Sequence, residues 1–168
     1  PVTVGCLSQF FPVTFTDEKG IQYITAHQYM TSQRALLFND QETFNKIIYS
    51  RSSHEINQLG QKIKNFNKKI WYKNEERIVY QGNSYKFNQN DKLKEFILSF
   101  PPNTIFVNAD PNNSNWGIQL HKNVPNVLDP SKWKGYNKLG FILTKLRDDF
   151  LLSQKEKISL SLQPSSTE

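Results

Sequence analysis

Cysteine is almost absent from this chain, which has only Cys6 among its 168 residues. A lone thiol excludes an internal disulfide and a zinc cluster built from cysteines. Histidine is scarce as well, and His27, His54 and His121 stand too far apart to have metal-ligand spacing. The sequence therefore predicts no metal site, and we expect no cofactor.

Long apolar runs are also missing. No stretch approaches the roughly 18 to 20 apolar residues that a membrane span requires, and the beginning of the chain lacks the pattern of a signal peptide. The hydrophobic share of 37% and the aromatic share of 13% suit a globular domain with a real core. We expect a soluble, cytoplasmic protein with no membrane contact, one domain over residues 1–152 and a polar tail over 153–168.

Acidic residues are in deficit, because 21 lysines and arginines stand against 15 aspartates and glutamates, for a net charge of +6. This excess favours anionic partners such as phosphates, nucleotides or nucleic acid. The lysines are spread over 62–73, 86–94 and 132–145, as on solvated helix faces. Lysine outnumbers arginine by 17 to 4, which disfavours readout of base edges. A basic nucleic-acid-binding module stays open as an alternative that rests on charge alone.

Helical periodicity is clearest over residues 25–39, where Thr25 is a suitable N-cap. The apolar spacing predicts one core-facing side, made of Ala26, Tyr29, Met30, Gln33, Leu36 and Leu37. A second stripe borders it and carries the ionisable groups, namely His27, Thr31, Arg34 and Phe38. This stripe is either a surface histidine beside a solvated arginine or part of a site.

The other elements follow from turn and cap signals. A hairpin formed by residues 1–16 and 21–24 is expected to lead into the first helix. Two apolar, β-branched segments, 104–108 and 116–120, predict further strands. Further helices are expected over residues 40–49, 52–60, 68–89, 90–98 and 137–152. Together these elements predict a mainly helical α+β fold.

Common catalytic signatures are absent: the chain has no Gly-rich phosphate loop, no serine elbow and no pair of carboxylates at helical spacing on a plausible pocket face. What distinguishes it is an ordered set of short strings. They are Leu7-Ser-Gln-Phe-Phe-Pro12, the helix over 25–39, Leu59-Gly60 followed by Lys62, Trp71 with Arg77 and Val79, Gly82-Asn83, Lys86-Phe-Asn-Gln-Asn90, Asn115-Trp-Gly-Ile118, and Trp133-Lys-Gly-Tyr-Asn-Lys-Leu-Gly140 leading to Arg147.

In this order the strings resemble the NADAR family, also called YbiA-like, from about residue 4 to 152. The resemblance implies a single compact α+β domain, mainly helical with a small β component. It also implies an association with N-glycosidic bonds of ribosylated compounds. Examples are ADP-ribosylated guanine in nucleic acid and ribosylamino intermediates of riboflavin synthesis.

The resemblance also implies ligand contacts at matched or neighbouring positions, namely Ser8, Gln9, Phe10, Gln28, Tyr29, Arg77, Lys86, Asn113, Trp116, Asn137 and Arg147. A structural interpretation of these positions stays open beside it. Tyr29, Trp71 and Gly140 suit packing, and the polar members of the set suit caps and braces.

The chain departs from the family pattern at several positions. His27 stands where the pattern has Glu, and Arg34 where it has Lys. Further departures are Gln61 for an arginine, Asn108 and Asn113 for acids, and Gln119 for a glycine. A carboxylate activates water or stabilises an oxocarbenium-like centre, which an amide cannot do. A guanidinium stays protonated and cannot form an imine.

These departures predict a domain that binds an ADP-ribose-type nucleotide with catalysis impaired or lost, as a sensor, sequestering protein or regulatory module. The alternative is an active N-glycosidase, in which His27 and Asp110 act as acid and base and Arg34 belongs to the catalytic set. The sequence names no protein partner.

Overall fold

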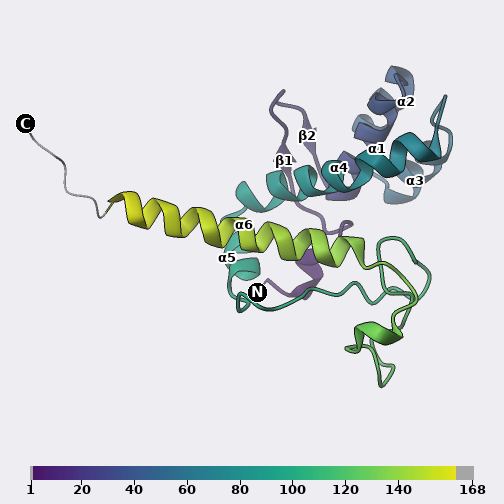
Figure 1. The fold of residues 1–168 in the computed structure, drawn as a ribbon. Helices are drawn as coiled ribbons and strands as arrows, with labels where there is room; N and C mark the ends of the chain where they lie inside the picture. The colour runs from purple at the N-terminus through teal and green to yellow at the C-terminus, as the bar shows by residue number, and fades with distance from the viewer. Residues whose placement is uncertain (1, 162–168) are drawn as a thin grey trace, which may run out of the picture. The chain divides into compact units, whose positions relative to one another are not determined.

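The computed structural model describes residues 2–161 (Figure 1). Its elements in chain order are η1 (Val4–Leu7), β1 (Phe15–Thr16), β2 (Gln22–Tyr23), α1 (Ala26–Leu37), α2 (Gln41–Tyr49), α3 (Ser53–Gln61), α4 (Lys68–Asn88), α5 (Asp91–Leu98), η2 (Pro130–Lys132) and α6 (Lys138–Ser161). The predicted mainly helical α+β fold is confirmed. None of the helices in this part of the chain is long and apolar enough to cross a lipid bilayer.

Contacts within the chain divide it into two compact units, and each is described by itself. The first unit ends at Phe96 and the second begins at Ile97. The first unit contains the hairpin, in which Phe15 pairs with Tyr23 across two short antiparallel strands. As predicted, this hairpin leads directly into α1.

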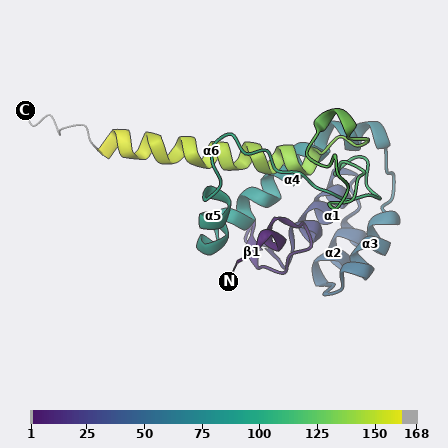
Figure 2. The ribbon, with the colours of Figure 1, turned by 90° about the horizontal axis from the view of Figure 1, so that it is seen from below.

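The centre of the first unit is α1, which packs against α2, α3 and α4 (Figure 2). An apolar core surrounds it, made of Phe15, Tyr23, Tyr29, Ala35, Phe38, Phe44, Ile47, Ile56, Ile63, Trp71 and Ile78. With neighbours on several sides, α1 has little surface left for solvent. This position decides which of its polar groups must find partners inside the protein.

The predicted single core face of α1 is wrong in part. Met30, Leu36 and Leu37 are only partly buried, whereas the polar residues His27 and Gln28 are buried. A periodic apolar stripe indicates burial against one neighbour, but three helices pack around α1. Of the stripe expected to border the core, His27, Thr31 and Phe38 are buried and Arg34 is half-buried.

Side chains cap the helices of the first unit as predicted. The Thr25 hydroxyl accepts a hydrogen bond from the Gln28 amide, and the Asp40 carboxylate accepts one from Thr43. Ser52 caps α3 by accepting from the Glu55 amide. Helix α3 continues to Gln61, one residue past the predicted end at Gly60.

Gly82 lies inside α4, where glycine is ordinarily unfavourable in a helix by about 1 kcal/mol relative to alanine. A Cβ atom at this position would stand 2.5 Å from Cδ1 of Tyr29. The absent side chain therefore admits the ring of Tyr29 between α1 and α4. Packing between the two helices outweighs helix propensity at this position.

The second unit is less regular. The predicted strands over 104–108 and 116–120 are wrong, since the structure has no strand in either segment. The two segments share one backbone bond, from Ile118 N to Asn108 O at 3.0 Å. Two other backbone amides of the first segment bond to side chains: Phe106 N donates to Thr144 Oγ1, and Asn108 N donates to Asn137 Oδ1. Side-chain partners thus replace a strand ladder.

Helix α6 extends beyond its predicted end near Leu152. It continues to Ser161, so the expected polar tail over 153–168 is helical in its first part, and residues 162–168 lie outside the described residues. Every residue from 152 to 161 is exposed. The helical period continues here without a buried face, which is why apolar spacing did not reveal it.

We expect Gly82→Ala to destabilise the protein by about 1 to 3 kcal/mol, the usual cost of overpacking. The gain in helix propensity is smaller than this clash. Urea unfolding followed by circular dichroism measures the change. In a Tyr29→Leu background the same substitution should be neutral or stabilising, and equal effects in both backgrounds would contradict the packing explanation.

Candidate functional site

His27 occupies a closed environment in the first turn of α1. Its side chain is 6% exposed, and the ring of Phe10 stacks on it with centroids 4.5 Å apart. The backbone of the segment 7–12 is tied to the helix, because His27 N donates to Gln9 O at 2.9 Å. Two strings that are well separated in the sequence therefore meet at this imidazole.

The protonation of His27 follows from its neighbours. The pKa of the imidazole is lowered to about 4, mainly by burial; hydrogen bonding to Asn57 opposes this lowering, and the charge of Arg34 adds to it. The Thr31 hydroxyl donates to His27 O at 2.8 Å, so towards the ring nitrogen Nε2, 3.5 Å away, it is an acceptor. This arrangement favours the proton on Nε2 and leaves Nδ1 as an acceptor. No described residue is hydrogen-bonded to Nδ1.

Arg34 lies two turns further along α1, on the side of His27. Its guanidinium packs on two aromatic faces, with Cζ 5.8 Å from the ring centroid of Phe66 and 5.4 Å from that of Trp71. One terminal nitrogen, Nη2, donates to Gly60 O at 3.0 Å. Nε is buried and has no hydrogen-bond partner within residues 2–161. The guanidinium is thus held in one orientation with a donor unused.

Gly60 makes room for this arginine. A Cβ atom on residue 60 would lie 2.4 Å from Nη2 of Arg34 and 2.8 Å from Cγ2 of Thr31. No other residue type fits without displacing the guanidinium. The glycine of the Leu59-Gly60 string therefore has a steric function at the site.

Lys86 brings the long helix α4 to the same segment 7–12. Its side chain is fully buried, and Nζ donates to Ser8 O at 2.8 Å. The ammonium also lies over the rings of Phe11 and Phe87. Burial lowers the pKa of this amine to about 8. Lys86 is a brace for the segment and a partly neutral amine near pH 8.

The remaining predicted contacts of the first unit have partners within the fold. Gln9 and Asn83 exchange two amide hydrogen bonds, of 2.9 and 3.2 Å. Gln28 accepts from Ile24 N and donates to the carbonyls of α2, including Ile47 O at 2.9 Å. These bonds occupy the amides, so their predicted ligand contacts stay predictions without a free group to support them.

Two other predicted contacts differ in exposure. Tyr29 belongs to the core, with its ring edge-on to those of Tyr23 and Tyr85. Arg77 is exposed on α4 and donates to Asn74. Within residues 2–161, neither is hydrogen-bonded to His27 or Arg34 or stacked on them. The first unit therefore brings together His27, Arg34, Phe10 and, through segment 7–12, Lys86.

The predicted residues of the second unit gather around Asn137. Its amide oxygen accepts from Asn108 N, and its amide nitrogen donates to Phe106 O at 3.0 Å. Its backbone, at a φ of 50°, donates to Gly117 O. A Cβ on Gly140 would stand 2.2 Å from Phe106 O. Asn137 joins the extended segment to the loop at the start of α6.

Arg147 is a second brace in this unit. The fully buried guanidinium donates to three backbone carbonyls, those of Pro101, Pro102 and Thr104, at 2.8 to 2.9 Å. It also pairs with Asp148. With its donors occupied, Arg147 holds the turn after α5 and leaves little for a ligand.

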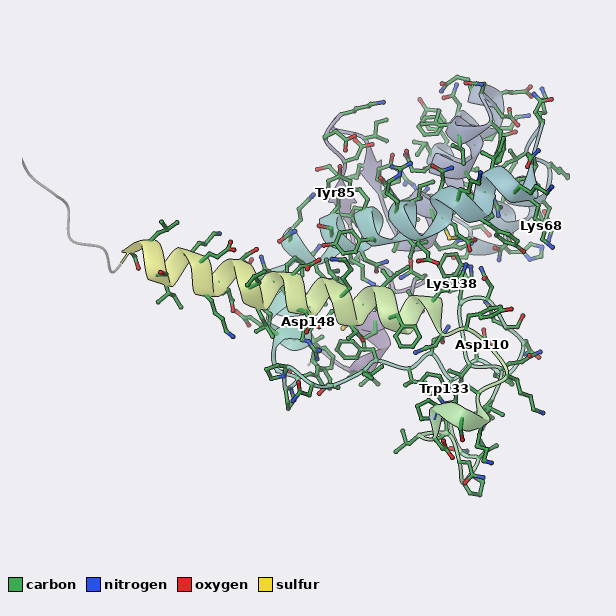
Figure 3. The ribbon with its side chains drawn as sticks, in the orientation of Figure 1. Lys68, Tyr85, Asp110, Trp133, Lys138 and Asp148 are labelled. Atoms are coloured by element: carbon green, nitrogen blue, oxygen red, sulfur yellow. The ribbon has the colours of Figure 1, made fainter. Side chains whose placement is uncertain are left out.

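Asp110, Asn113 and Trp116 lie in one polar loop, and Figure 3 shows Asp110 on the chain that leads to Lys138 at the start of α6. The Asp110 carboxylate accepts from Asn112 N at 2.9 Å, and Asn113 Oδ1 accepts from Trp116 N at 2.9 Å. All three side chains are partly exposed. These are turn-forming bonds, and they leave part of the Asp110 carboxylate available.

Sequence reasoning missed Phe66 as a part of this environment, and it missed the burial of Glu75 on the neighbouring helix. Glu75 is a fully buried carboxylate on α4, one turn after Trp71. The spacing of Trp71 and Glu75 by four residues was the available signal. In the described part of the chain, no group of three or more histidine, cysteine or acidic side chains could hold a metal ion.

Comparison with known proteins decides the family. The NADAR domain profile matches residues 1–151. The chain belongs to the NADAR family. This NADAR chain is 39% identical to N-glycosidase R617 of Acanthamoeba polyphaga mimivirus over 150 residues, which are 87% of this chain and 88% of that protein.

Two further matches are more distant. Protein irg-1 of Caenorhabditis elegans is 27% identical over 153 residues, 90% of this NADAR chain and 72% of that protein. The NMR structure of the Escherichia coli protein YbiA matches with a TM-score of 0.73 and 22% identity, covering 90% of this chain and 81% of that one. The YbiA structure confirms the fold, and the profile match together with the mimivirus relative confirms the predicted resemblance to the family.

The pKa of His27 predicts a pH dependence of stability. The imidazole is protonated near pH 6.5 in the unfolded chain but only near pH 4 in the folded one, so the unfolded state binds more protons between these values. Stability should therefore fall as the pH is lowered from about 6.5 to 4, by up to about 1.4 kcal/mol per pH unit. His27→Gln should reduce this slope in urea unfolding, whereas His54→Gln, at an exposed position, should keep it. An NMR titration midpoint of His27 near 6.5 would contradict the assignment.

The bonds of Asn137 predict a sensitive position in the second unit. Asn137→Asp keeps an acceptor for Asn108 N but removes the donor to Phe106 O and buries a carboxylate beside that carbonyl. We expect a loss of about 1 to 3 kcal/mol in thermal or urea unfolding at pH 7. At pH 4 the carboxyl group of the variant can be protonated and donate to Phe106 O, so the variant should recover stability there. An equal stability difference between variant and wild type at pH 7 and pH 4 would contradict this explanation.

Proposed function

We propose that the chain is an N-glycosidase that hydrolyses the bond between a ribosyl C1′ and a base nitrogen. The name of the mimivirus relative supports this proposal, as does membership of the NADAR family. The observation that carries it is the buried, neutral imidazole of His27 with an unused acceptor at Nδ1. In the reaction, water adds to C1′, the C1′–N bond electrons leave with the base, and His27 takes the water proton.

His27 suits the task of the glutamate that the family pattern has at this position. An imidazole with a pKa of about 4 has the proton affinity of an ordinary carboxylate, whose pKa is about 4.3. The base strength is therefore retained, while the negative charge is lost. Since that charge stabilises an oxocarbenium-like centre, we expect slower turnover than with a carboxylate. Stacking on Phe10 keeps the imidazole oriented.

A route through an imine at position 34 is excluded on chemical grounds. Arginine keeps its proton and has no free amine to attack C1′. Hydrolysis by activated water is thus the reaction that the side chains of α1 can support. The leaving base takes its proton from solvent water, which completes the hydrolysis.

A second candidate function is ligand binding without turnover, as in a sensor or sequestering domain. The observation that favours it is the pair of replacements on α1, His27 and Arg34, which together remove an acid and a lysine from the family pattern. Histidine in place of glutamate removes one negative charge, and arginine in place of lysine keeps the positive one, so the local charge shifts towards positive, which suits an anionic nucleotide. One experiment separates the two functions.

The experiment incubates the protein with ADP-ribosylated guanosine and with a ribosylamino pyrimidine in ¹⁸O-labelled water. We expect release of the free base and incorporation of ¹⁸O at C1′, both measured by mass spectrometry. His27→Gln should lower kcat by about 10²-fold or more, the usual effect of removing a general base. His54→Gln is the matched control and should keep the wild-type rate. Saturable binding of either compound with no turnover would replace the first function by the second.

A further inference from the structure

The guanidinium of Arg34 has no anionic partner within residues 2–161, and the proposed proton transfer at His27 does not require it. Cations that are withdrawn from water in proteins are paired with anions or hydrogen-bonded, because removing a charge from water is costly. Arg34 is withdrawn in part: the residue as a whole is half-buried, and its Nε atom is buried. Burial lowers the pKa of Arg34, and no carboxylate of residues 2–161 contributes against that lowering. Its buried Nε also has no partner in this part of the chain. The guanidinium is therefore prepared for an anion that the protein itself does not supply.

The surroundings fix how that anion would be held. Phe66 and Trp71 cover the guanidinium, and the bond from Nη2 to Gly60 O sets its rotation. A planar guanidinium held in this way presents two parallel N–H groups, which match the oxygen pair of a phosphate or carboxylate. Nearby, the buried Nδ1 of His27 is unpartnered as well. Both unused groups lie on the same side of α1.

The charge around this clamp favours phosphate. Residues 61–74, which contain both covering aromatics, include five lysines and no acidic residue, and the two glutamates of α4, Glu75 and Glu76, follow directly after them. Of these lysines, Lys64 forms an ion pair with Glu42. Lys68, which is labelled in Figure 3, lies in the first turn of α4. Lysines in a first helical turn oppose the helix dipole, so the segment is more positive than its fold requires. A dianionic group gains more from this field than a monoanionic carboxylate.

We propose that Arg34, clamped by Phe66 and Trp71 above Gly60, binds a phosphate or diphosphate group of the ligand. Only one part of this proposal, that the ligand is a ribosyl nucleotide, rests on the proposed function. The site accepts phosphorylated ribosyl compounds in preference to unphosphorylated ones. Arg34 is therefore a specificity residue, and His27 is the residue that acts on the bond.

The test uses inorganic pyrophosphate as the probe, measured by calorimetry at about 0.15 M salt. We expect saturable binding by the wild type and at least about tenfold weaker binding by Arg34→Lys, which keeps the charge but loses the paired donors. Phe66→Leu removes one face of the clamp at a position that is 46% exposed, so the fold should survive and binding should weaken. Arg51→Lys, on an exposed arginine outside the site, is the matched control and should bind like the wild type.

A second readout reports on the donor directly. The chain has only four arginines, so few Nε–H signals appear in an ¹H–¹⁵N spectrum, and the Arg34→Lys spectrum assigns the one of interest. Pyrophosphate should shift that signal and slow its exchange with water. Succinate bound as tightly as pyrophosphate would overturn the choice of phosphate. Equal pyrophosphate affinity in Arg34→Lys and the wild type, or no saturation up to about 10 mM, would overturn the site.

These outcomes are distinct from failure of the proposed function. Pyrophosphate binding that depends on Arg34, without cleavage of any ribosyl substrate, supports the anion site and removes the N-glycosidase. Cleavage of unphosphorylated ribosyl compounds at the rate of phosphorylated ones, without pyrophosphate binding, removes the anion site and keeps the N-glycosidase.

Discussion

A helix that is enclosed by its neighbours can carry polar side chains only if each finds a partner inside the protein. Helix α1 is built under this constraint. Gln28 bonds to α2 and to the end of the hairpin, and the Ser32 hydroxyl donates to Tyr29 O at 2.8 Å. Against this background the two unused nitrogens, on His27 and Arg34, are exceptions on a helix that otherwise satisfies its polar groups. Chemistry is expected where the protein leaves such groups without internal partners.

The same constraint organises the second unit, where regular secondary structure is sparse. Residues 101–108 have no strand partner, so their carbonyls and amides need side-chain partners. Arg147 takes three of the carbonyls, and Asn137 takes one carbonyl and one amide. A polar residue that matches a family pattern can therefore owe its place to backbone satisfaction. For these two residues the bracing interpretation has the direct geometric support.

The sequence predicted the helices of this chain well because their signals are local. Caps such as Thr25 and Asp40 act within one turn, and apolar spacing reports a helix wherever it lies. The strands failed because β-branched composition over 104–108 describes an apolar extended segment, whatever its partner. The burial of His27 and of the Arg34 Nε atom could not be predicted, since it depends on three helices packing around α1. The contacts of Phe66 and Trp71 with the Arg34 guanidinium could not be predicted for a similar reason, because they form only in the folded unit, between residues more than 30 positions apart in the sequence.

The missing side chain of Gly60 makes positions 34 and 60 depend on each other. A Cβ atom at residue 60 would meet both Nη2 of Arg34 and Cγ2 of Thr31, so a larger residue fits there only if the side chain at position 34 is moved or shortened. Two residues that compete for one volume cannot be varied independently, and the energetic effects of changing them should not add. Any engineering of the ligand preference through Arg34 must therefore treat these two positions as a pair.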